Sequence, residues 1–328
     1  MAVTTTENGQ PVANLPSIDI NLLQAQDAAE YQRLLSACEV YGFFYLNLQG
    51  YGSMVADWQK VLELMGEYFA QPLDVKMLDA RHSDTHGYEP CGTSAGARED
   101  EPDHYESLKV SRAEMTNFDE ALPQLAKDNS ELFERFTSAA HNITMTILDA
   151  LSTLLELDEA HALRNYHRDG EPSLSTMSMF RYPKQERYGE GVGHNKHTDL
   201  GTLTFLLTTQ WGLQVLSPEC NEWRFIAPRP DHAIINVADS LRFLSGFRLK
   251  SAVHQVLPMH GLQHEHRYSI AYFLRAEDNV QYKDSQGRVF TAKQWHDTKF
   301  DVFRESHDKQ AQDSILTGGM ERGNSIVV

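Results

Sequence analysis

A histidine and an aspartate separated by one residue, His197 and Asp199, most constrain what this chain can fold into. On a β-strand, side chains at positions i and i+2 point to the same face, so both groups can hold one ion. His254 supplies a second imidazole after several segments with strand character. Two neutral imidazoles and one carboxylate on one face of an ion leave three coordination positions open, the facial arrangement that suits ferrous iron in oxygen-activating enzymes. A chain with such a site has to bring distant strands back to one point.

A guanidinium and a hydroxyl follow further along the chain, at Arg267 and Ser269. They share one face of a strand, and together they offer forked hydrogen-bond donors to a carboxylate. Fe(II) with one aspartate keeps about one positive charge and the arginine adds another, so a dianion neutralises the pocket. A 2-oxo acid dianion satisfies this balance if it chelates the metal at one end and meets Arg267 and Ser269 at the other.

Four blocks of sequence carry a resemblance to a known family. In chain order they are His197-Thr198-Asp199-Leu200-Gly201-Thr202-Leu203-Thr204, Gly212-Leu213-Gln214-Val215, Lys250-Ser251-Ala252-Val253-His254 and Arg267-Tyr268-Ser269. An His-x-Asp motif alone arises often by chance, whereas four blocks in order at workable spacing are specific. In these blocks the chain resembles the isopenicillin N synthase-like family of 2-oxoglutarate/Fe(II)-dependent dioxygenases.

The resemblance implies that His197, Asp199 and His254 hold Fe(II), and that 2-oxoglutarate is the cosubstrate anchored by Arg267 and Ser269. It also implies that 2-oxoglutarate is decarboxylated to succinate and CO2 with O2, and that the oxidant so formed removes a hydrogen atom from an unactivated carbon. Hydroxylation is the default outcome. Desaturation, ring closure and ring expansion require only a different fate for the substrate radical.

Two alternatives stay open at this point. An iron oxidase of the same fold that uses O2 without 2-oxoglutarate can keep an Arg-x-Ser pair, and it is favoured if no succinate forms under any substrate condition. A non-catalytic jelly-roll binding protein with a remnant metal site is disfavoured because all three metal ligands and the anion-binding pair occur together. It gains support if an His197→Ala variant keeps the biological effect of its ligand.

Three residues are candidates to contact cosubstrate or substrate by resemblance. Tyr105 and Lys109 lie in a segment that resembles the family segment passing over the substrate, and Tyr182 aligns with a tyrosine that lines the family's pocket. Many relatives carry Asn two residues before that tyrosine, whereas this chain carries Phe180, which indicates a more apolar wall.

The substrate expected from these residues is a small, largely apolar metabolite of secondary metabolism. No second carboxylate clamp is evident in the sequence. The apolar residues expected near the pocket are Met177, Met179, Phe180 and Phe243.

Other histidines are predicted to lie outside the metal site. His194 is expected at the rim of the pocket without being a ligand, and Lys196 is expected to point away from the iron because adjacent strand positions face opposite sides. Two further groups are predicted to lie in exposed loops and not in a second metal site: His82, His86 and His104, and His260, His264 and His266.

Composition and charge indicate which partners and which cellular compartment to expect. A net charge of −17 argues against a nucleic-acid surface, which needs a basic stripe. The three cysteines form no CxxC pair, which indicates a reducing compartment. Residues 1–14 lack a signal-peptide pattern, and no apolar run approaches the roughly 18 residues of a membrane span. The protein is predicted to be cytoplasmic, with a small-molecule substrate, no nucleic-acid or membrane partner and an open oligomeric state.

Hydrophobic periodicity predicts the architecture. Helical spacing marks segments near 28–40, 54–69 and 130–154, and short strands with turn residues between them dominate from about residue 175. The pattern has no alternating β-α units, so it favours an α+β, mainly β fold: a double-stranded β-helix (jelly-roll) core braced by N-terminal and long central helices. The resemblance implies the same fold. Residues 1–328 are predicted to form a single dioxygenase domain, with 1–14 and about 309–328 as flexible tails.

Overall fold

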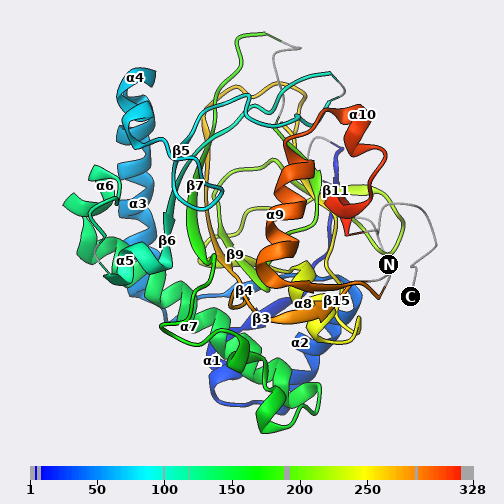
Figure 1. Ribbon diagram of the computed structural model, residues 1–328. Helices are drawn as coiled ribbons and strands as arrows, with labels where there is room; N and C mark the ends of the chain where they lie inside the picture. The colour runs from blue at the N-terminus through cyan, green and yellow to red at the C-terminus, as the bar shows by residue number, and fades with distance from the viewer. Residues whose placement is uncertain are drawn as a thin grey trace.

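Two facing β-sheets form the centre of the protein (Figure 1). The structure is a computed structural model that describes residues 4–5, 9–98, 100–117, 119–187, 193–284 and 287–318. Its larger sheet is built from β3 (Ser17–Asp19), β4 (Phe43–Asn47), β5 (Gly87–Glu89), β6 (Glu106–Ser111), β7 (Thr176–Tyr182), β9 (Leu203–Leu207), β12 (His232–Val237) and β14 (Arg267–Leu274). Its smaller sheet is built from β1 (Thr4–Thr5), β2 (Pro11–Val12), β8 (His194–His197), β10 (Leu213–Leu216), β11 (Trp223–Phe225) and β13 (His254–Val256).

The strand order shows a jelly roll. The larger sheet has the order β3-β4-β12-β9-β14-β7-β6-β5, and the smaller sheet has the order β1-β2-β11-β10-β13-β8. Neighbours along the chain therefore often lie in different sheets, and most pairs are antiparallel, with β3–β4 and β2–β11 parallel. A third pair, β15 (Gln281–Lys283) with β16 (Val289–Thr291), lies beside the sheets. The predicted mainly-β fold with a jelly-roll core is confirmed.

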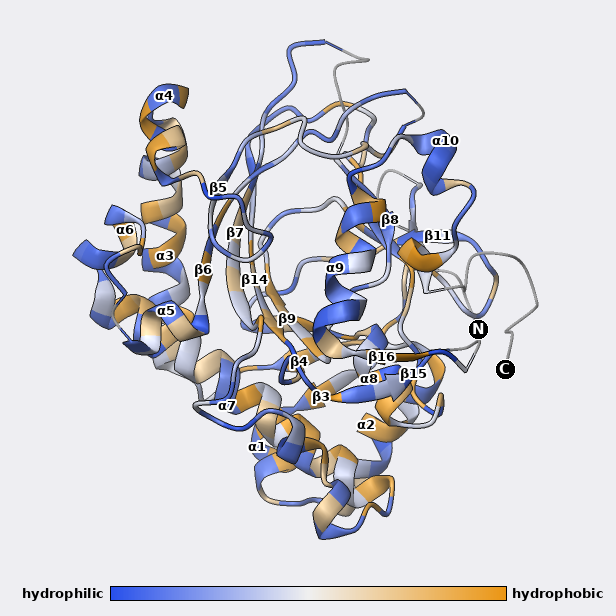
Figure 2. Cartoon of the chain, viewed as in Figure 1, coloured by the Kyte–Doolittle hydropathy of each residue, from blue (hydrophilic) through white to orange (hydrophobic). Residues whose placement is uncertain are grey.

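Helices pack on the outer face of the larger sheet, and α9 (Ala292–Phe303) lies on the other side of that sheet (Figure 1). The helices are α1 (Ile20–Gln24), α2 (Ala28–Val40), α3 (Gly52–Ala70), α4 (Leu73–Lys76), α5 (Arg112–Asn117), α6 (Gln124–Asp128), α7 (Ser130–Leu154), α8 (Asp239–Leu244), α9 (Ala292–Phe303) and α10 (His307–Gln310), with the 3₁₀ turns η1 (Met77–Asp79), η2 (Glu159–His161), η3 (Leu163–Tyr166) and η4 (Ile315–Thr317). In Figure 1, α3 and α7 lie along one side of the larger sheet and α9 lies on the other. Hydrophobic and hydrophilic residues alternate along α3 and α7 (Figure 2), as expected for helices with one face on a core.

The first long helix shows how local chemistry sets its bounds. Asp27 accepts a hydrogen bond from the backbone of Glu30 and caps the start of α2. Gly42 follows the end of the helix with φ +67, and a Cβ there would lie 2.2 Å from the carbonyl oxygen of Lys250. Only glycine fits this close approach. The chain therefore leaves α2 directly into the buried strand β4.

The hydrophobic residues form separate cores on the two faces of the larger sheet. Side chains of α2, α3 and α7 pack against one face, and a smaller group fills the space between the two sheets. Along β7, Met177 and Met179 face the helices, and the Thr137 hydroxyl lies 3.9 Å from the Met177 sulfur. Phe180 and Tyr182 face the space between the sheets. The prediction that Met177 and Met179 contact the substrate is therefore wrong, because alternate strand positions point to opposite faces.

The prediction that Phe243 lies near the substrate is also wrong. Phe243 lies on α8 and packs with Tyr282, Trp295 and Ile315 in a third apolar cluster under α9. It lines neither of the pockets at the metal-ligand candidates. Its role in this structure is to hold the C-terminal helix on the fold.

Parts of both predicted tails pack against the fold. Within the predicted tail 309–328, Ile315 and Leu316 are buried, and the Leu316 carbonyl accepts a hydrogen bond from the backbone of Thr198. Within 1–14, Val12 and Ala13 are buried and pair with β11. The prediction of flexible tails is wrong for these parts, while residues 1–3, 6–8 and 319–328 lie outside the described residues. The single-domain assignment stays a prediction.

No helix among the residues that the structure describes is long and apolar enough to cross a membrane.

Candidate functional site

Three of the predicted residues converge at one point between the sheets. The Nε2 atom of His197 lies 3.4 Å from Oδ1 of Asp199, and the Nε2 atom of His254 lies 3.7 Å from the same oxygen. One donor atom from each residue lies within 4.8 Å of the other two. Within the described part of the chain, no other group of His, Cys, Asp or Glu side chains meets in this way.

Strand pairing brings the two histidines together. His197 ends β8 and His254 begins β13, and the two residues are direct partners in the antiparallel ladder, next to a register irregularity between His254 and Val256. Asp199 lies two residues beyond the end of β8, and its carboxylate faces the His197 ring. The 57-residue separation in sequence thus becomes contact across one pair of strands.

Backbone carbonyls orient both imidazole rings. Nδ1 of His197 lies 2.7 Å from the carbonyl oxygen of Asn195, and Nδ1 of His254 lies 3.1 Å from that of Ala252. A carbonyl only accepts, so each Nδ1 carries a proton and each Nε2 is the ring nitrogen that faces Asp199. Burial, with the neighbouring His197, lowers the pKa of His254 to about 4, so this ring stays neutral near pH 7.

Two polar side chains fix the aspartate. Its Oδ2 accepts hydrogen bonds from the Thr204 hydroxyl at 2.5 Å and from the Asn236 amide at 2.7 Å, which leaves Oδ1 facing the histidines. Burial by itself raises the pKa of Asp199, but His254, His197 and the Thr204 hydroxyl outweigh it and hold the pKa well below its usual range. Sequence reasoning assigned no role to Asn236. The signal was a polar residue after three apolar ones in β12.

A buried guanidinium stands at the far side of the same pocket. Arg267 is 1% exposed, donates from Nε to the Trp211 carbonyl at 2.9 Å, and lies 3.5 Å from the Ser269 hydroxyl. The Tyr182 ring centroid is 4.8 Å from the guanidinium carbon, and these two residues are partners across β14 and β7. No carboxylate among the described residues forms an ion pair with Arg267. Burial raises the pKa of Tyr182 to about 12 although Arg267 opposes the rise, so the phenol stays protonated.

A glycine makes room for that guanidinium. Gly212 has φ +134, and a Cβ there would lie 3.1 Å from Nε and 3.2 Å from Cδ of Arg267. Any larger residue would displace the arginine side chain or strain the backbone. The Gly212 block and the Arg267 block, which are separate in the sequence, therefore form one wall of the pocket.

The structure also places Tyr105, Lys109 and Phe180 at the site. All three line a second pocket that opens from the metal-ligand candidates. The Lys109 ammonium lies 2.6 Å from a carboxylate oxygen of Glu89, so its charge is already balanced. That these side chains touch a substrate stays a prediction.

The two residues that flank His197 most closely differ in their surroundings. Lys196 is exposed and lines neither of the pockets at the metal-ligand candidates. His194 stacks between Tyr105 and His197, with ring centroids 4.4 Å and 4.6 Å away, and burial holds its pKa well below the usual value. Neither the group His82, His86 and His104 nor the group His260, His264 and His266 forms a metal cluster among the described residues.

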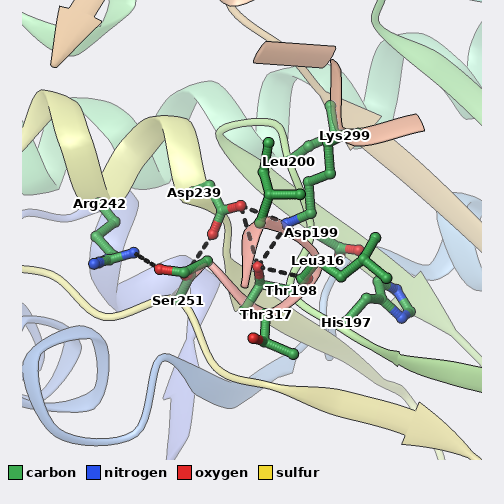
Figure 3. Close-up of polar contacts among 12 residues, drawn as sticks. His197, Thr198, Asp199, Leu200, Asp239, Arg242, Ser251, Lys299, Leu316 and Thr317 are labelled. Carbon is green, nitrogen blue, oxygen red and sulfur yellow. Dashed lines mark hydrogen bonds and ion pairs between the residues drawn. The ribbon is translucent and has the colours of Figure 1, made fainter. Parts of the chain in front are cut away.

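Lys299 of α9 contacts the segment that joins His197 to Asp199 (Figure 3). Thr198, between His197 and Asp199, has its hydroxyl 2.7 Å from the ammonium of Lys299 on α9. Lys299 also lies 2.5 Å from Asp239, a fully buried carboxylate at the start of α8. Sequence reasoning missed this network because nothing in the spacing of these residues indicates that they meet.

Two pockets meet at the metal-ligand candidates. One contains Arg267, Tyr182 and Asn236, and the other contains Lys109, Arg275 and three residues of α9. Both are lined by His197, Asp199 and His194, and by two phenylalanines, Phe180 and Phe273. One space can hold a small anion at Arg267, and the second can hold another molecule beside the same ion.

Comparison with protein families gives two matches. Residues 161–276 match the model of the 2OG-Fe(II) oxygenase superfamily, and residues 15–130 match the N-terminal model of the non-haem dioxygenases described as acting in morphine synthesis. The first match contains the metal-ligand candidates and Arg267.

Curated relatives match over nearly the whole chain. A protein named 2-oxoglutarate-dependent dioxygenase frbH from Dothideomycetidae sp. is 57% identical over 94% of this chain and 97% of its own length. Oxidoreductase vrtI from Penicillium aethiopicum is 55% identical over 98% of this chain and 78% of its own. 2-oxoglutarate-dependent dioxygenase gloE from Glarea lozoyensis is 46% identical over 95% of each chain.

Solved structures agree on the fold. A full-length protein from Neurospora crassa, solved in complex with alpha-KG, is 20% identical with a TM-score of 0.71 over 91% of this chain and 99% of its own. The dioxygenase for auxin oxidation from rice is 24% identical with a TM-score of 0.67 over the same shares of the two chains. At these identities the likeness concerns the fold.

Proposed function

Because this chain belongs to the 2OG-Fe(II) oxygenase superfamily and is a 2-oxoglutarate-dependent dioxygenase, we propose that His197, Asp199 and His254 hold its iron. Arg267 and Ser269 bind the distal carboxylate of 2-oxoglutarate. The observation that supports this assignment most is the meeting, in one pocket, of the three donor atoms and a buried guanidinium that lacks a carboxylate partner among the described residues.

The donor set fits ferrous iron. Donor atoms about 2.1 Å from a common ion at right-angle to tetrahedral spacing lie about 3.0–3.4 Å apart. The distances of 3.4 and 3.7 Å from the Asp199 oxygen to the two Nε2 atoms are close to this range. Two neutral imidazoles and one carboxylate are the ligands of facial non-haem iron sites. Asn236 and Thr204 hold the carboxylate in the orientation that such an ion requires.

Each group of the chain has a separate part in the reaction. No side chain stores oxidising equivalents. When bound, Fe(II) with 2-oxoglutarate and O2 would supply them, with release of succinate and CO2. Arg267 and Tyr182 hold the anionic end of the cosubstrate, and burial of the guanidinium strengthens that interaction. Phe180 and Phe273, at the junction of the two pockets, exclude water from the reacting carbon. Hydroxylation of an unactivated carbon is the outcome that this arrangement favours.

The names of the relatives disfavour both alternatives that the sequence left open. Curated relatives that are 57% and 46% identical carry the name 2-oxoglutarate-dependent dioxygenase, which disfavours both an oxidase that dispenses with 2-oxoglutarate and a non-catalytic binding protein. The substrate class stays a proposal. A single small molecule beside the iron fits the second pocket.

Metal content tests the assignment directly. The purified wild-type protein, loaded anaerobically with Fe(II), is expected to hold one iron per chain and to form succinate from 2-oxoglutarate in air. An His197→Ala variant is expected to lose both. His194→Ala is the matched control, because its ring stacks 4.6 Å from His197 but is not among the metal-ligand candidates, so iron binding is retained. Full iron retention by His197→Ala would contradict the assignment.

A further inference from the structure

A second arginine lies on the same face of the strand that carries Arg267. The odd-numbered residues of β14, from Arg267 through Ser269, Ala271 and Phe273, face the space between the sheets, and Arg275 continues this series one residue beyond the strand. The Arg275 guanidinium carbon lies 5.2 Å from the centroid of the Phe273 ring. The strand thus carries one guanidinium into each of the two pockets, with the metal-ligand candidates between them.

Arg275 is the cation of the second pocket that forms no ion pair among the described residues. The ammonium of Lys109 is balanced by Glu89 at 2.6 Å, and that of Lys299 is balanced by Asp239 at 2.5 Å. Arg275 is 7% exposed and forms no ion pair with any carboxylate of the described residues. A buried charge without a partner is costly, so the pocket is incomplete as it stands.

The hydrogen bonds of Arg275 lead to the same conclusion. Its Nη1 donates to the carbonyl of Leu174, while its Nε is buried and has no partner among the described residues. Burial lowers the pKa of Arg275 to about 10, and Asp199 is the main charge that opposes this change. When Asp199 binds a divalent ion, that favourable charge is cancelled. The completed metal site therefore increases the need for an anion at Arg275.

Five aromatic side chains other than histidine line the same pocket. Tyr105, Phe180 and Phe273 form one side, and Phe300 and Phe303 of α9 form the other. These rings can cover an apolar body, while the charged residues other than Arg275 pair with each other. The rim is also balanced, because Arg304 forms an ion pair with Asp84.

We infer that the primary substrate is a small carboxylic acid with an apolar body, whose carboxylate binds Arg275 and whose oxidised carbon faces the metal site. This inference rests on the proposed function and names the substrate class of the same site. The planar guanidinium matches a carboxylate, which accepts more than one of its N–H groups. The substrate differs from the largely apolar metabolite that the sequence predicts, because the second carboxylate clamp is visible only in the folded chain.

Acid and amide pairs test the inference. The probes are 3-phenylpropanoate with 3-phenylpropanamide and hexanoate with hexanamide, titrated into the anaerobic Fe(II)/2-oxoglutarate protein. Binding is followed by calorimetry and by the shift of the metal-to-ligand charge-transfer band. Wild-type protein is expected to bind each acid at least about tenfold more tightly than its amide, the ratio typical of hydrogen bonds to a charged group. Absence of this preference, including absence of binding by every acid, overturns the inference.

Variants assign the preference to Arg275. Arg275→Met is expected to abolish the acid-over-amide ratio with unchanged affinity for 2-oxoglutarate, and Arg275→Lys is expected to restore part of it. Arg224→Met is the matched control, because Arg224 is also buried with an unpaired Nε but lines neither pocket. An unchanged ratio in Arg275→Met overturns the inference. If that variant does not fold, the wild-type ratio together with Arg275→Lys decides.

Succinate formation distinguishes a failure of the role of Arg275 from a failure of the proposed function. Wild-type protein that forms succinate without preferring acids refutes only the role of Arg275. Wild-type protein that binds iron but forms no succinate with any probe refutes the proposed function as well.

Discussion

Replacing Lys299 by methionine tests how the C-terminal helix supports the metal site. The Lys299 ammonium lies 2.5 Å from Asp239 and 2.7 Å from the hydroxyl of Thr198, and both partners are buried (Figure 3). Methionine keeps most of the side-chain volume but removes the charge. Asp239 then keeps its hydrogen bonds from Ser251 at 2.7 Å and from Thr198 at 3.1 Å, without any cation at this distance.

The magnitude follows from burial. Removing one partner of a buried ion pair costs about 3–5 kcal/mol, because the remaining charge is left uncompensated. The hydrogen bonds that stay on Asp239 place the expected loss near about 3 kcal/mol. For a chain of 328 residues, that corresponds to a fall of about 4 °C in the midpoint of thermal unfolding. Iron affinity is expected to fall about tenfold, since Thr198 loses the contact that fixes it between two metal-ligand candidates.

The same helix offers the control. Lys293 pairs with Asp297 at 2.8 Å, but both side chains are about half exposed. Such a pair contributes at most about 0.5 kcal/mol, so Lys293→Met is expected to leave the midpoint nearly unchanged. Differential scanning calorimetry and metal analysis of both variants check the prediction. If Lys299→Met unfolds at the same temperature as Lys293→Met and keeps its iron, the buried pair does not stabilise the site and the reasoning is refuted.

Three further outcomes follow from the geometry. Arg267→Met is expected to raise the dissociation constant for 2-oxoglutarate at least about tenfold, with iron content unchanged. Calorimetry with 2-oxoglutarate measures this constant, and an unchanged constant would contradict the role of Arg267 as the anchor. Asn236→Ala removes the 2.7 Å hydrogen bond to Asp199 and is expected to weaken iron binding about 10- to 100-fold, measured by competition with a chelator; equal affinity would rule out that role. Burial lowers the pKa of His167 to about 4, below its unfolded value of about 6.5. The unfolded chain therefore takes up the proton first, and the stability contributed by this group is complete above about pH 6.5 and decreases by up to about 3 kcal/mol as the pH falls toward 4. Urea unfolding of the metal-free protein at pH 7 and pH 5 checks this, with His167→Gln expected to show a shallower dependence than the exposed control His161→Gln.

The local elements were readable from the sequence because their signals are local. The bounds of α2 were predicted from helical spacing near residues 28–40, and the structure gives the same helix, Ala28–Val40. The spacing of His197 and Asp199 placed two donors on one face, and the structure keeps them there. The match of Arg267 with Ser269 likewise follows from the period of a strand.

The wrong predictions for Met177 and Met179 concern a strand, β7, whose side chains pack into two different hydrophobic cores. Met177, Met179, Phe180 and Tyr182 are all apolar or aromatic neighbours on β7, so composition could not separate them. Alternation separates them once the face of one is known, and only the packing of the helices on the larger sheet decides that face. Phe243 was predicted near the substrate because its contact with α9 is a tertiary contact that the sequence does not reveal.

The sequence by itself determined the donor types of the proposed metal site and the close spacing of His197 and Asp199, since both are properties of a short local segment. Tertiary structure alone decided what surrounds that site. Asn236, Lys299 and Arg275 reach it from three separate segments, and no periodicity in the sequence connects them. Strand pairing and helix docking are cooperative properties of the whole chain. The groups that orient the ligand candidates, and the two arginines without an ion pair among the described residues, therefore come together only when both sheets and α9 are in place.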